Sequence, residues 1–383
     1  MSGTIAQARY TESFPVNRPS ILSRIDAIDP IAYSLTRNVG DGAVTALSPY
    51  ISRGVISTKI ILERLLENGF NARELTPYIQ QMAWREYFQR VWQNTEGNLL
   101  GDLKNPQMEV EHSSMPEAVL NGRMGIRSVD EMIETLRRTG YIHNHYRMYL
   151  ASIVCNVGRA HWLLPARWMY YHLLDADWAS NACSWQWVAG AFSSKKYWVN
   201  QENINRYSRT NQALTFLDFS YKELPEKAVP EILKTAEMPK LHSLLPESDV
   251  VELDPELPTL VYTFHNLDPL WRASMQANRV LILEPSFFLQ FPVSPNTLNF
   301  VSALAREIDG LCIFSGEWND LFGSAYPGEI YFKEHPTNDH FSGVQDERDW
   351  LFPEVTGFHP SFFSYWKKCE KVLAKLLLDR NHP

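Results

Sequence analysis

The sequence contains few cysteines, and their spacing does not suit metal binding. The four residues, Cys155, Cys183, Cys312 and Cys369, lie far apart and include no C-x-x-C pair. The spacings of zinc ribbons and iron–sulfur clusters are therefore excluded, and we expect neither a metal centre nor a cluster. This cysteine usage favours a reducing compartment, the cytoplasm.

Long hydrophobic runs are also missing. The N-terminal segment MSGTIAQARYTESFPVNRPS has no apolar stretch behind a basic start, and no apolar run elsewhere is long enough to cross a membrane. Internal repeats and low-complexity tracts are absent as well. We therefore expect a soluble, unprocessed protein with no membrane partner.

No large excess of one charge sign is present, but the charge is unevenly distributed. The formal net charge is −8; residues 1–220 hold 22 Lys and Arg against 20 Asp and Glu, whereas residues 221–383 hold 14 against 24. A nearly neutral first half can still present a local basic surface to DNA. The net charge therefore does not exclude a nucleic-acid partner.

Aromatic residues, by contrast, are abundant at 13% of the 383 residues. Eight of the 12 tryptophans fall within the first 200 positions: Trp84, Trp92, Trp162, Trp168, Trp178, Trp185, Trp187 and Trp198. This clustering suggests a flat aromatic cofactor or stacked bases in addition to core packing. The composition is otherwise that of a globular protein, and the length favours two domains.

The first half of the chain is predicted to be helical. Apolar residues recur every three or four positions in SPYISRGVISTKIILERLLENG (48–69) and ARELTPYIQQMAWREYFQRVW (72–92). In SVDEMIETLRRTG, Ser128 and Glu131 form a predicted capping box and Gly140 a predicted stop. Further helices are expected over 144–157, 165–174 and 179–189.

After Pro258 the pattern changes to short apolar runs typical of buried parallel strands. These runs are TLVYTF, RVLILEP, LCIFSG and EIYFK, with the amphipathic helix NTLNFVSALAREID between the second and third and a final helix over 361–380. The predicted fold class is thus α plus α/β. It comprises a helical domain (1–224), a Pro- and Glu-rich linker (225–257), and a small Rossmann-like domain with a parallel sheet (258–383).

Polar residues gather between Gly140 and Tyr207. Asn144 and Arg147 are one helical turn apart, Asp175 and Asp177 lie where a helix gives way to a loop, and Asn181 follows four positions later. Carboxylates accept hydrogen bonds from ring N–H groups and Arg supplies charge-assisted donors, so this set can hold a polar heterocycle. The spacing also suits a buried Arg–Asp pair that holds helices together.

Four segments give this region a family resemblance. They are TALSPYISRGVIS (45–57), AWREYF (83–88), TGYIHNHYRM (139–148) and LLDADWASNACSWQW (173–187). Their order and spacing resemble the flavin-binding helical domain of the photolyase/cryptochrome superfamily over roughly residues 30–225. The resemblance implies FAD as the cofactor and a light-driven function.

The resemblance also implies which residues contact FAD. The diphosphate and ribityl chain would be held by Tyr33, Arg37, Thr45, Leu47 and Ser48, with Arg85 as a further phosphate-side donor. Asn144 and Arg147 match the polar wall around the cofactor, and Arg147 is expected to pair with Asp175. Asp177 matches the residue at the isoalloxazine edge, and Asn181 the residue that faces flavin N5. For Ser48 alone, a helix cap is the alternative.

Two tryptophans match an electron-transfer chain by the same resemblance. Trp185 and Trp162 correspond to the first two members of the chain that reduces photoexcited, oxidised flavin in this family. The place of the third member, near Glu109, holds no aromatic residue. Trp92, Trp168, Tyr146 and Tyr170 are candidates to replace it, although each aromatic is also suited to core packing.

The substrate residues match the family less completely. Trp84 and Trp187 correspond to the aromatic wedge for a flipped pyrimidine dimer, on which stacking contributes about 1–3 kcal/mol per base. Met148 matches a pocket residue, whereas Gln81 and His145 stand where a glutamate and an arginine are common. The catalytic candidates are thus Trp84, Gln81, Met148, Trp187, Asn181, Trp185 and Trp162. The DNA-binding candidates are Trp84, His145, Trp187, Lys195 and Lys196, the two lysines being equally suited to a solvated surface.

The domain order resembles one branch of the family. Ordinary members carry an α/β antenna domain before the helical domain, whereas here a similar pattern follows it. This resembles the inverted-topology bacterial photolyases, the NewPHL group, whose C-terminal domain seals the flavin from solvent. The resemblance implies a monomeric, blue-light-driven photolyase, a carbon–carbon lyase that splits cyclobutane pyrimidine dimers in UV-damaged, single-stranded DNA, without an antenna chromophore. The alternatives are a cryptochrome-like flavin photoreceptor without repair activity, a dark structural protein, and a generic doubly wound domain for residues 258–383.

Overall fold

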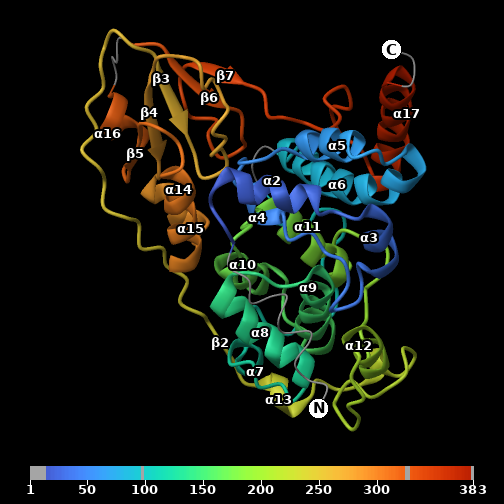
Figure 1. Cartoon of the computed structure of the whole chain (residues 1–383). Coiled ribbons are helices and arrows are strands. Elements are labelled where there is room, and N and C mark those ends of the chain that lie inside the picture. Colours follow the sequence, from blue (N-terminus) through green and yellow to red (C-terminus); the bar gives the residue numbers. More distant parts are fainter. Residues whose placement is uncertain (1–13, 96–98, 324–327, 381–383) are drawn as a thin grey trace. The chain divides into compact units, whose positions relative to one another are not determined.

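The computed structural model describes residues 14–95, 99–323 and 328–380 (Figure 1). The chain divides into two compact units, each assembled from separate segments. Unit 1 consists of Met1–Phe14, Leu35–Val44 and Asn98–Leu241, and unit 2 of Pro15–Ser34, Thr45–Gly97 and His242–Pro383. Helical segments thus contribute to both units. The domain limits 1–224, 225–257 and 258–383 stay a prediction.

The first half of the described chain is helical. Its helices are α2 (Arg18–Asp26), α3 (Pro30–Thr36), α4 (Ser48–Ser52), α5 (Thr58–Glu67), α6 (Ala72–Gln93), α7 (Glu117–Leu120), α8 (Arg127–Thr139), α9 (Asn144–Ala151), the π-helix η1 (Ser152–Val157), α10 (Leu163–His172), α11 (Trp178–Ala189) and α12 (Gln201–Ser208). The segment predicted as a linker holds η2 (Leu224–Glu226), α13 (Glu231–Lys234) and β2 (Ala236–Glu237), which pairs with β1 (Met115–Pro116). No helix of the described ranges has both the length and the apolarity that crossing a membrane requires.

The C-terminal half is α/β. Its elements are β3 (Thr259–Tyr262), β4 (Asn278–Ile282), α14 (Pro285–Gln290), α15 (Pro295–Ala305), β5 (Leu311–Phe314), α16 (Trp318–Phe322), β6 (Ile330–Lys333), β7 (Val344–Asp346) and α17 (Phe362–Arg380). The strands form one parallel sheet in the order β5-β4-β3-β6-β7. All four predicted strands and the predicted α plus α/β class are confirmed. β7 was not predicted, because its three residues are not buried and show no apolar run.

Two helix predictions need correction. The predicted helix 48–69 is broken, since α4 ends at Ser52 and α5 begins at Thr58. Gly54 between them has a φ of +68° and approaches His265 so closely that a Cβ would lie 2.7 Å from its carbonyl oxygen. Only glycine allows both that conformation and that approach. Ser57 then caps α5 by accepting a hydrogen bond from Ile60 N at 3.2 Å.

The predicted capping box of α8 is also wrong. The helix begins at Arg127 with Ile126 in the cap position, and no side chain caps it. Asp130 instead accepts hydrogen bonds from Met124 N and Gly125 N, both at 2.9 Å, and so closes the preceding loop. Ser128 therefore lies inside the first turn. The predicted stop is confirmed, because Gly140 ends the helix with a φ of +70°.

Within unit 1, α9 continues into a π-helical turn, so the predicted helix 144–157 is one continuous segment of two types. All six residues of η1 are buried. Ser152 Oγ accepts from Val199 N at 3.0 Å, and Asn156 Nδ2 donates to the carbonyls of Val188 and Tyr197 at 3.1 and 2.7 Å. The widened turn thus anchors the chain that follows α11, and π-turns occur often near functional sites.

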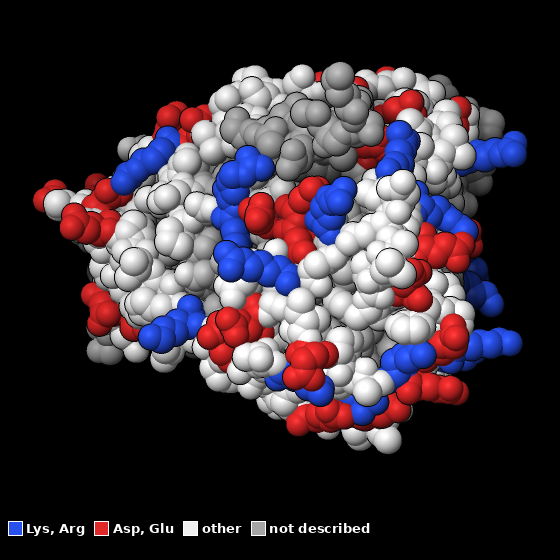
Figure 2. Space-filling view, turned by 90° about the horizontal axis from the view of Figure 1, so that it is seen from below, with Lys and Arg blue, Asp and Glu red and all other residues white. Residues whose placement is uncertain are grey.

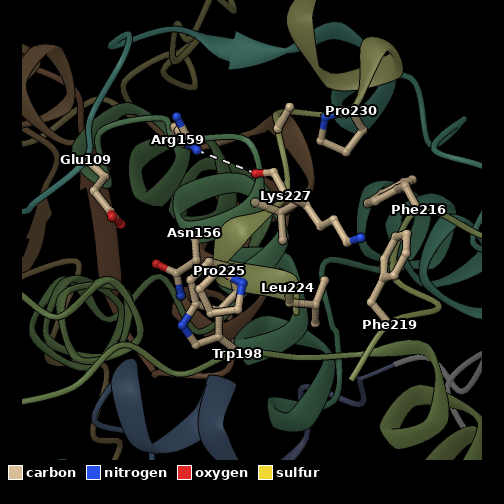
Figure 3. A pocket seen from close by; sticks show the side chains of 12 residues that line it. Glu109, Asn156, Arg159, Trp198, Phe216, Phe219, Leu224, Pro225, Lys227 and Pro230 are labelled. Carbon is tan, nitrogen blue, oxygen red and sulfur yellow. Dashed lines mark hydrogen bonds between the residues drawn. The ribbon is translucent and has the colours of Figure 1, made fainter. Parts of the chain in front are cut away.

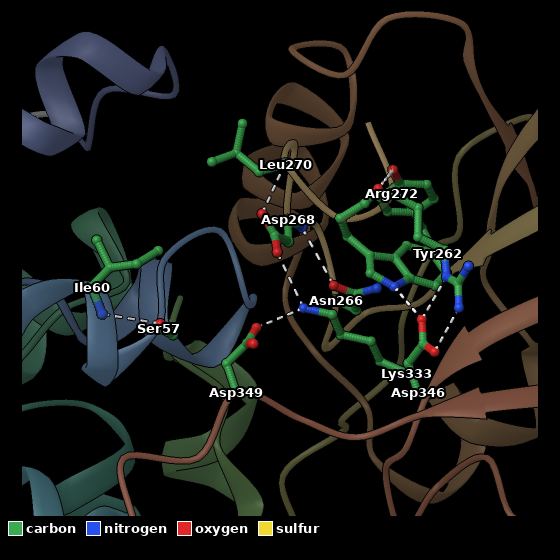
Figure 4. A network of polar contacts seen from close by, with 11 residues as sticks. Ser57, Ile60, Tyr262, Asn266, Asp268, Leu270, Arg272, Lys333, Asp346 and Asp349 are labelled. Atoms are coloured by element: carbon green, nitrogen blue, oxygen red, sulfur yellow. Dashed lines mark hydrogen bonds and ion pairs between the residues drawn. The ribbon is translucent and has the colours of Figure 1, made fainter. Parts of the chain in front are cut away.

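Within unit 2, ion pairs tie the edge of the sheet to the segment after β3 (Figure 4). Asp346 accepts two hydrogen bonds from Arg272, at 2.7 and 2.9 Å, and one from Trp271 Nε1 at 2.8 Å. Lys333 lies nearby and contacts Asp268 and Asp349 at 3.1 and 2.7 Å. Burial alone would lower the pKa of Lys333, but the two carboxylates raise it overall.

This network predicts a pH dependence of stability. The hydrogen bonds from Arg272 lower the pKa of Asp346, so its contribution is present above about pH 4 and is lost as pH falls through the lowered pKa. Asp346→Asn is expected to reduce the free energy of unfolding at pH 7 by about 1–2 kcal/mol. Urea unfolding at stepwise lower pH should show that the free energies of unfolding of wild type and Asp346→Asn converge. A constant difference down to pH 2 would contradict this account.

Candidate functional site

The residues predicted from the sequence fall into two sets, one in each unit, and each set is described within its own unit. Unit 1 contains Arg37, Asn144, His145, Arg147, Met148, Trp162, Asp175, Asp177, Asn181, Trp185, Trp187, Lys195 and Lys196. Unit 2 contains Tyr33, Thr45, Leu47, Ser48, Gln81, Trp84 and Arg85.

The predicted ion pair between Arg147 and Asp175 is confirmed. Arg147 Nη2 lies 2.7 Å from Asp175 Oδ2 and Nη1 lies 3.3 Å from Oδ1, while Nε donates to Ile142 O at 3.1 Å. The Asp175 side chain is 5% exposed and that of Arg147 19%. This largely buried, bidentate ion pair fixes α9 to the loop that leads into α11. Asn144 and Met148, on the same helix, are exposed and half-buried.

Three further predicted residues share one face of α11. Asp177, Asn181 and Trp185 are four residues apart, and only 7%, 6% and 2% of their surfaces are exposed. Asp177 caps the helix by accepting from Ser180 N at 3.0 Å, and Asn181 Nδ2 donates to Ala166 O at 2.7 Å. Ala176, between the two aspartates, has a φ of +25°. The chain thus turns sharply to direct two carboxylates to different positions.

The histidines before and within α9 are electrically neutral near pH 7. His143 Nδ1 accepts from His145 N at 3.1 Å and so caps α9. Burial lowers the pKa of both imidazoles to about 4, and the positive charge of Arg37 adds to the effect on His145. The ring of His145 packs against Tyr207 and Tyr149, with centroids 4.7 and 4.9 Å away. His145 therefore cannot supply the charge of an arginine at this position.

The predicted electron-transfer residues are buried in unit 1. Trp162 is 0% exposed, and its ring centroid lies 6.4 Å from that of Trp178, which lies 5.6 Å from Tyr170. Of the proposed replacements for the third member, Tyr170 is thus linked to Trp162 through an intervening ring. Of the other candidates, Trp92 belongs to unit 2. The ring of Trp168 contacts that of His172, and the ring of Tyr146 contacts that of His143.

The expected place of the third member opens onto a pocket. Glu109 lines this pocket of about 230 Å³ together with Arg159, Asn156 and Trp198, and two phenylalanines close another side (Figure 3). Lys227 lies over the ring of Phe219 at 4.0 Å, so one aromatic face there is already covered.

The predicted DNA-contacting residues of unit 1 differ in their freedom to bind. Trp187 is 38% exposed, and its ring lies 5.8 Å from that of Tyr197. Lys195 is exposed, but Lys196 Nζ is bound to Glu109 Oε2 at 2.6 Å and to Met108 O at 3.0 Å. Lys196 lowers the pKa of Glu109 in return. On the face seen in Figure 2, basic side chains likewise alternate with acidic ones.

In unit 2, Trp84 is stacked by a residue of the last helix. The rings of Trp84 and Phe362 are nearly parallel, at 11°, with centroids 3.6 Å apart. Phe362 is buried and Trp84 half-buried. One face of the predicted base-stacking indole is therefore covered by protein. Gln81 lies one turn earlier on α6 and is half-buried.

The remaining predicted residues of unit 2 lie on α3, at or just before α4, and on α6. Tyr33 meets Tyr78 edge-on with centroids 4.8 Å apart, and Thr45 hydrogen-bonds to Tyr78, whose pKa burial raises. Leu47, not Ser48, occupies the cap position of α4, and no side chain caps it. Ser48 is thus not the cap of this helix. The half-buried Arg85 lies on α6, in the turn after Gln81.

Known proteins match this region. Residues 78–231 match the family described as "FAD binding domain of DNA photolyase". Over these residues the helical part of the chain is similar to the photolyase/cryptochrome family. The deoxyribodipyrimidine photo-lyase of Streptomyces griseus is 31% identical over 150 residues, which cover 39% of this chain and 32% of that protein.

Cryptochromes match as well as photolyases. Cryptochrome DASH of Natronomonas pharaonis is 25% identical over 193 residues, covering 48% of this chain and 41% of that protein. The crystal structure of a bacterial class III photolyase from Agrobacterium tumefaciens has a TM-score of 0.44 and 24% identity, and the match covers 49% of this chain and 41% of that one. The chain thus matches less than half the length of these relatives.

Predicted residues in each unit, considered separately, suit parts of the FAD cofactor chemically. The buried face of α11 offers a carboxylate and an amide, which complement the N–H and carbonyl groups of a flavin ring. The start of α4 offers hydroxyls at Thr45 and Ser48, and Arg85 a guanidinium, which complement phosphate oxygens. The roles of these individual residues stay predictions.

A second potential nucleotide crevice, in unit 2, is narrowed by side chains to a pocket of about 20 Å³. In doubly wound sheets such a crevice lies beyond the carboxyl ends of adjacent strands. Here His265 after β3 and His335 after β6 stack with centroids 3.8 Å apart, and the guanidinium of Arg53 covers the ring of Phe264 at 3.6 Å. Burial, reinforced by nearby guanidinium groups, lowers the pKa of both histidines.

Sequence reasoning missed Trp178 and Phe362. Trp178 follows Asp177 directly and donates from Nε1 to Leu99 O at 3.1 Å. The sequence could have identified Trp178, because it lies in the aromatic-rich segment 173–187 that carries the resemblance. Phe362 is one of two adjacent phenylalanines at the start of the last helix, and nothing local connects it with α6.

Proposed function

We propose that this chain is a blue-light-driven, FAD-dependent photolyase that splits cyclobutane pyrimidine dimers, with a preference for single-stranded DNA. The observation that carries the proposal is the buried polar face of α11, held in place by the Arg147–Asp175 pair within residues that match the FAD-binding domain. When bound, flavin supplies the absorption of light and the electron that opens the ring. The protein orients both reactants and excludes water.

Each residue has an assigned task in this proposal. Asp177 accepts from a flavin ring N–H group, and the Asn181 amide, positioned by Ala166 O, presents its oxygen toward N5. Trp187 offers an exposed ring on which a flipped base can stack. Trp185 and Trp162 serve to replenish the reduced flavin with electrons.

The preference for a single strand follows from the small number of available cations. Extruding a dimer from a duplex costs a few kcal/mol, and least where the strand is already unpaired. Of the cationic candidates predicted to contact DNA in unit 1, Lys196 is engaged by Glu109 and His145 is neutral, which leaves the exposed Lys195 among these three to offset that cost. We further propose a monomer in a reducing compartment. We also propose that no antenna chromophore is bound, because the stacked rings of His265 and His335 and their neighbours leave a pocket of only about 20 Å³ in the crevice of the sheet.

A flavin photoreceptor without repair activity is the second candidate. It is favoured by one observation, the stacking of Phe362 on Trp84, which covers a surface that a dimer would need.

One experiment separates the two candidates. The purified, flavin-loaded chain is illuminated with blue light in the presence of a dimer-containing oligothymidine, and dimers are counted by chromatography, with a dark sample as the control. A photolyase removes dimers only in the light, and Trp187→Ala should slow removal by roughly ten- to a hundredfold through lost stacking. Bleaching of the flavin without any loss of dimers would reject repair in favour of the photoreceptor.

A further inference from the structure

A carboxylate is in direct contact with the second tryptophan of the predicted chain. Trp162 Nε1 donates to Asp102 Oδ1 at 2.6 Å, and Asp102 Oδ2 accepts from Gln107 N at 2.8 Å. Gln107 also binds Trp162 N through its side-chain oxygen at 2.9 Å. The loop that carries Asp102 and Gln107 thus binds both the indole and the backbone N–H of Trp162, directly before α10.

The indole N–H groups of Trp178 and Trp185 are placed differently from that of Trp162. Trp178 donates to a backbone carbonyl, that of Leu99, and the Trp185 indole N–H is buried without a hydrogen-bond acceptor in the described part of the chain. A carboxylate stabilises a neighbouring positive charge and can accept a proton, whereas a backbone carbonyl at neutral pH cannot take one. The carboxylate of Asp102 therefore stabilises a positive charge that reaches Trp162.

We propose that Asp102 is the proton acceptor for oxidised Trp162, which makes Trp162 the terminal electron donor. The inference rests on the proposed flavin function. Trp162 gives one electron to Trp185, which has given one to the photoexcited, oxidised flavin. The Trp162 N–H bond then breaks, its proton passes to Asp102 Oδ1, and a neutral indole radical is left. A thiol in solution later returns one electron to this radical, and Asp102 returns the proton. The thiol releases its own proton to water and becomes a thiyl radical, two of which couple to a disulfide.

Loss of the proton explains how a chain of two tryptophans can suffice. A neutral radical attracts the transferred electron less than a radical cation does, so the back-reaction slows without a third aromatic at Glu109. His161 Nε2 lies 3.6 Å from Asp102 Oδ1, and the two side chains are 29% and 23% exposed. This pair gives the proton a path from the buried indole toward water.

The test uses Asp102→Asn in the full, flavin-loaded chain, with Glu111→Gln as the matched control. Glu111 is a carboxylate of the same unit that pairs with Arg159 and, within the described residues, accepts no hydrogen bond from an indole N–H. Transient absorption measures the yield and decay of the tryptophan radical in H₂O and in D₂O. In wild type and Glu111→Gln, D₂O should slow deprotonation. In Asp102→Asn this isotope effect should vanish. The yield of the long-lived radical should fall about tenfold, because a hydrogen bond to a charged acceptor is stronger than one to a neutral acceptor by a free energy that corresponds to about this factor.

The outcomes distinguish this inference from the proposed function. A wild-type protein whose flavin cannot be photoreduced would overturn the proposed function, whereas normal photoreduction with an unchanged isotope effect in Asp102→Asn would overturn only the role of Asp102. Asp102→Glu should restore the effect in part. If Asp102→Asn does not fold, the absence of any isotope effect in wild type would still reject the inference. The Trp162 Nε1–H resonance of the flavin-free protein, which Asp102→Asn alone should shift, gives a readout independent of light.

Discussion

Asp175→Ala is expected to destabilise the protein by about 3–5 kcal/mol and to abolish flavin retention, because it leaves a largely buried guanidinium without its partner. Arg147 makes two hydrogen bonds to this carboxylate, and the Asp175 side chain is 5% exposed. Urea unfolding measures the loss in stability, and the ratio of flavin to protein after purification measures retention. The matched control is Glu202→Ala, which breaks the exposed pair with Arg206 and should change stability by less than about 0.5 kcal/mol.

A double substitution separates the structural role of the pair from its role in flavin binding. In Arg147→Met with Asp175→Leu, both charges are replaced by apolar groups, which often restores the stability lost on breaking a buried pair. If the pair serves only to hold helices together, this protein should fold and retain flavin. We expect it to fold and to lose flavin. Full retention by the double variant would remove Arg147 and Asp175 from the proposed site.

The parts that sequence predicted well are those in which a local pattern meets a local cause. α6 spans the predicted 72–92 almost residue for residue, because its apolar spacing is uninterrupted and Asn71 caps it with Glu74. The four strands were predicted because β3, β4, β5 and β6 are each a short, buried apolar run. The Arg147–Asp175 pair was predicted from the family resemblance.

The parts that sequence did not predict depend on contacts between distant residues. The break at Gly54 follows from its approach to the backbone of His265, and the capping of α8 failed because Asp130 turns back to the preceding loop. The stacking of Phe362 on Trp84 joins residues nearly 280 positions apart. No periodicity records such pairs, and so the covered face of Trp84 emerges only from the fold.

Glu86→Ala is expected to lower the free energy of unfolding by about 3–5 kcal/mol, since it leaves three buried hydrogen-bond donors without an acceptor. Glu86 lies on α6, two residues after Trp84, and its carboxylate accepts from Leu351 N, Phe352 N and Tyr365 Oη at 2.6, 3.0 and 2.7 Å. It thus binds α17 and the segment before it. Glu86→Gln should cost about half as much, because the amide keeps one acceptor oxygen but turns an N–H group toward a donor.

The same substitution tests whether Glu86 keeps Trp84 covered. Glu86 holds Tyr365 on the helix that begins with Phe362, so releasing it should free Phe362 from the indole of Trp84. In Glu86→Ala, hydrogen exchange should become faster at the backbone amides of Leu351 and Phe352. The indole of Trp84 should become more accessible to a soluble quencher of its fluorescence. Glu67→Ala, at an exposed position of α5, is the control and should alter neither. If exchange at both amides stays slow, Glu86 does not hold this segment; if it becomes faster while Trp84 stays protected, Phe362 remains in place without it.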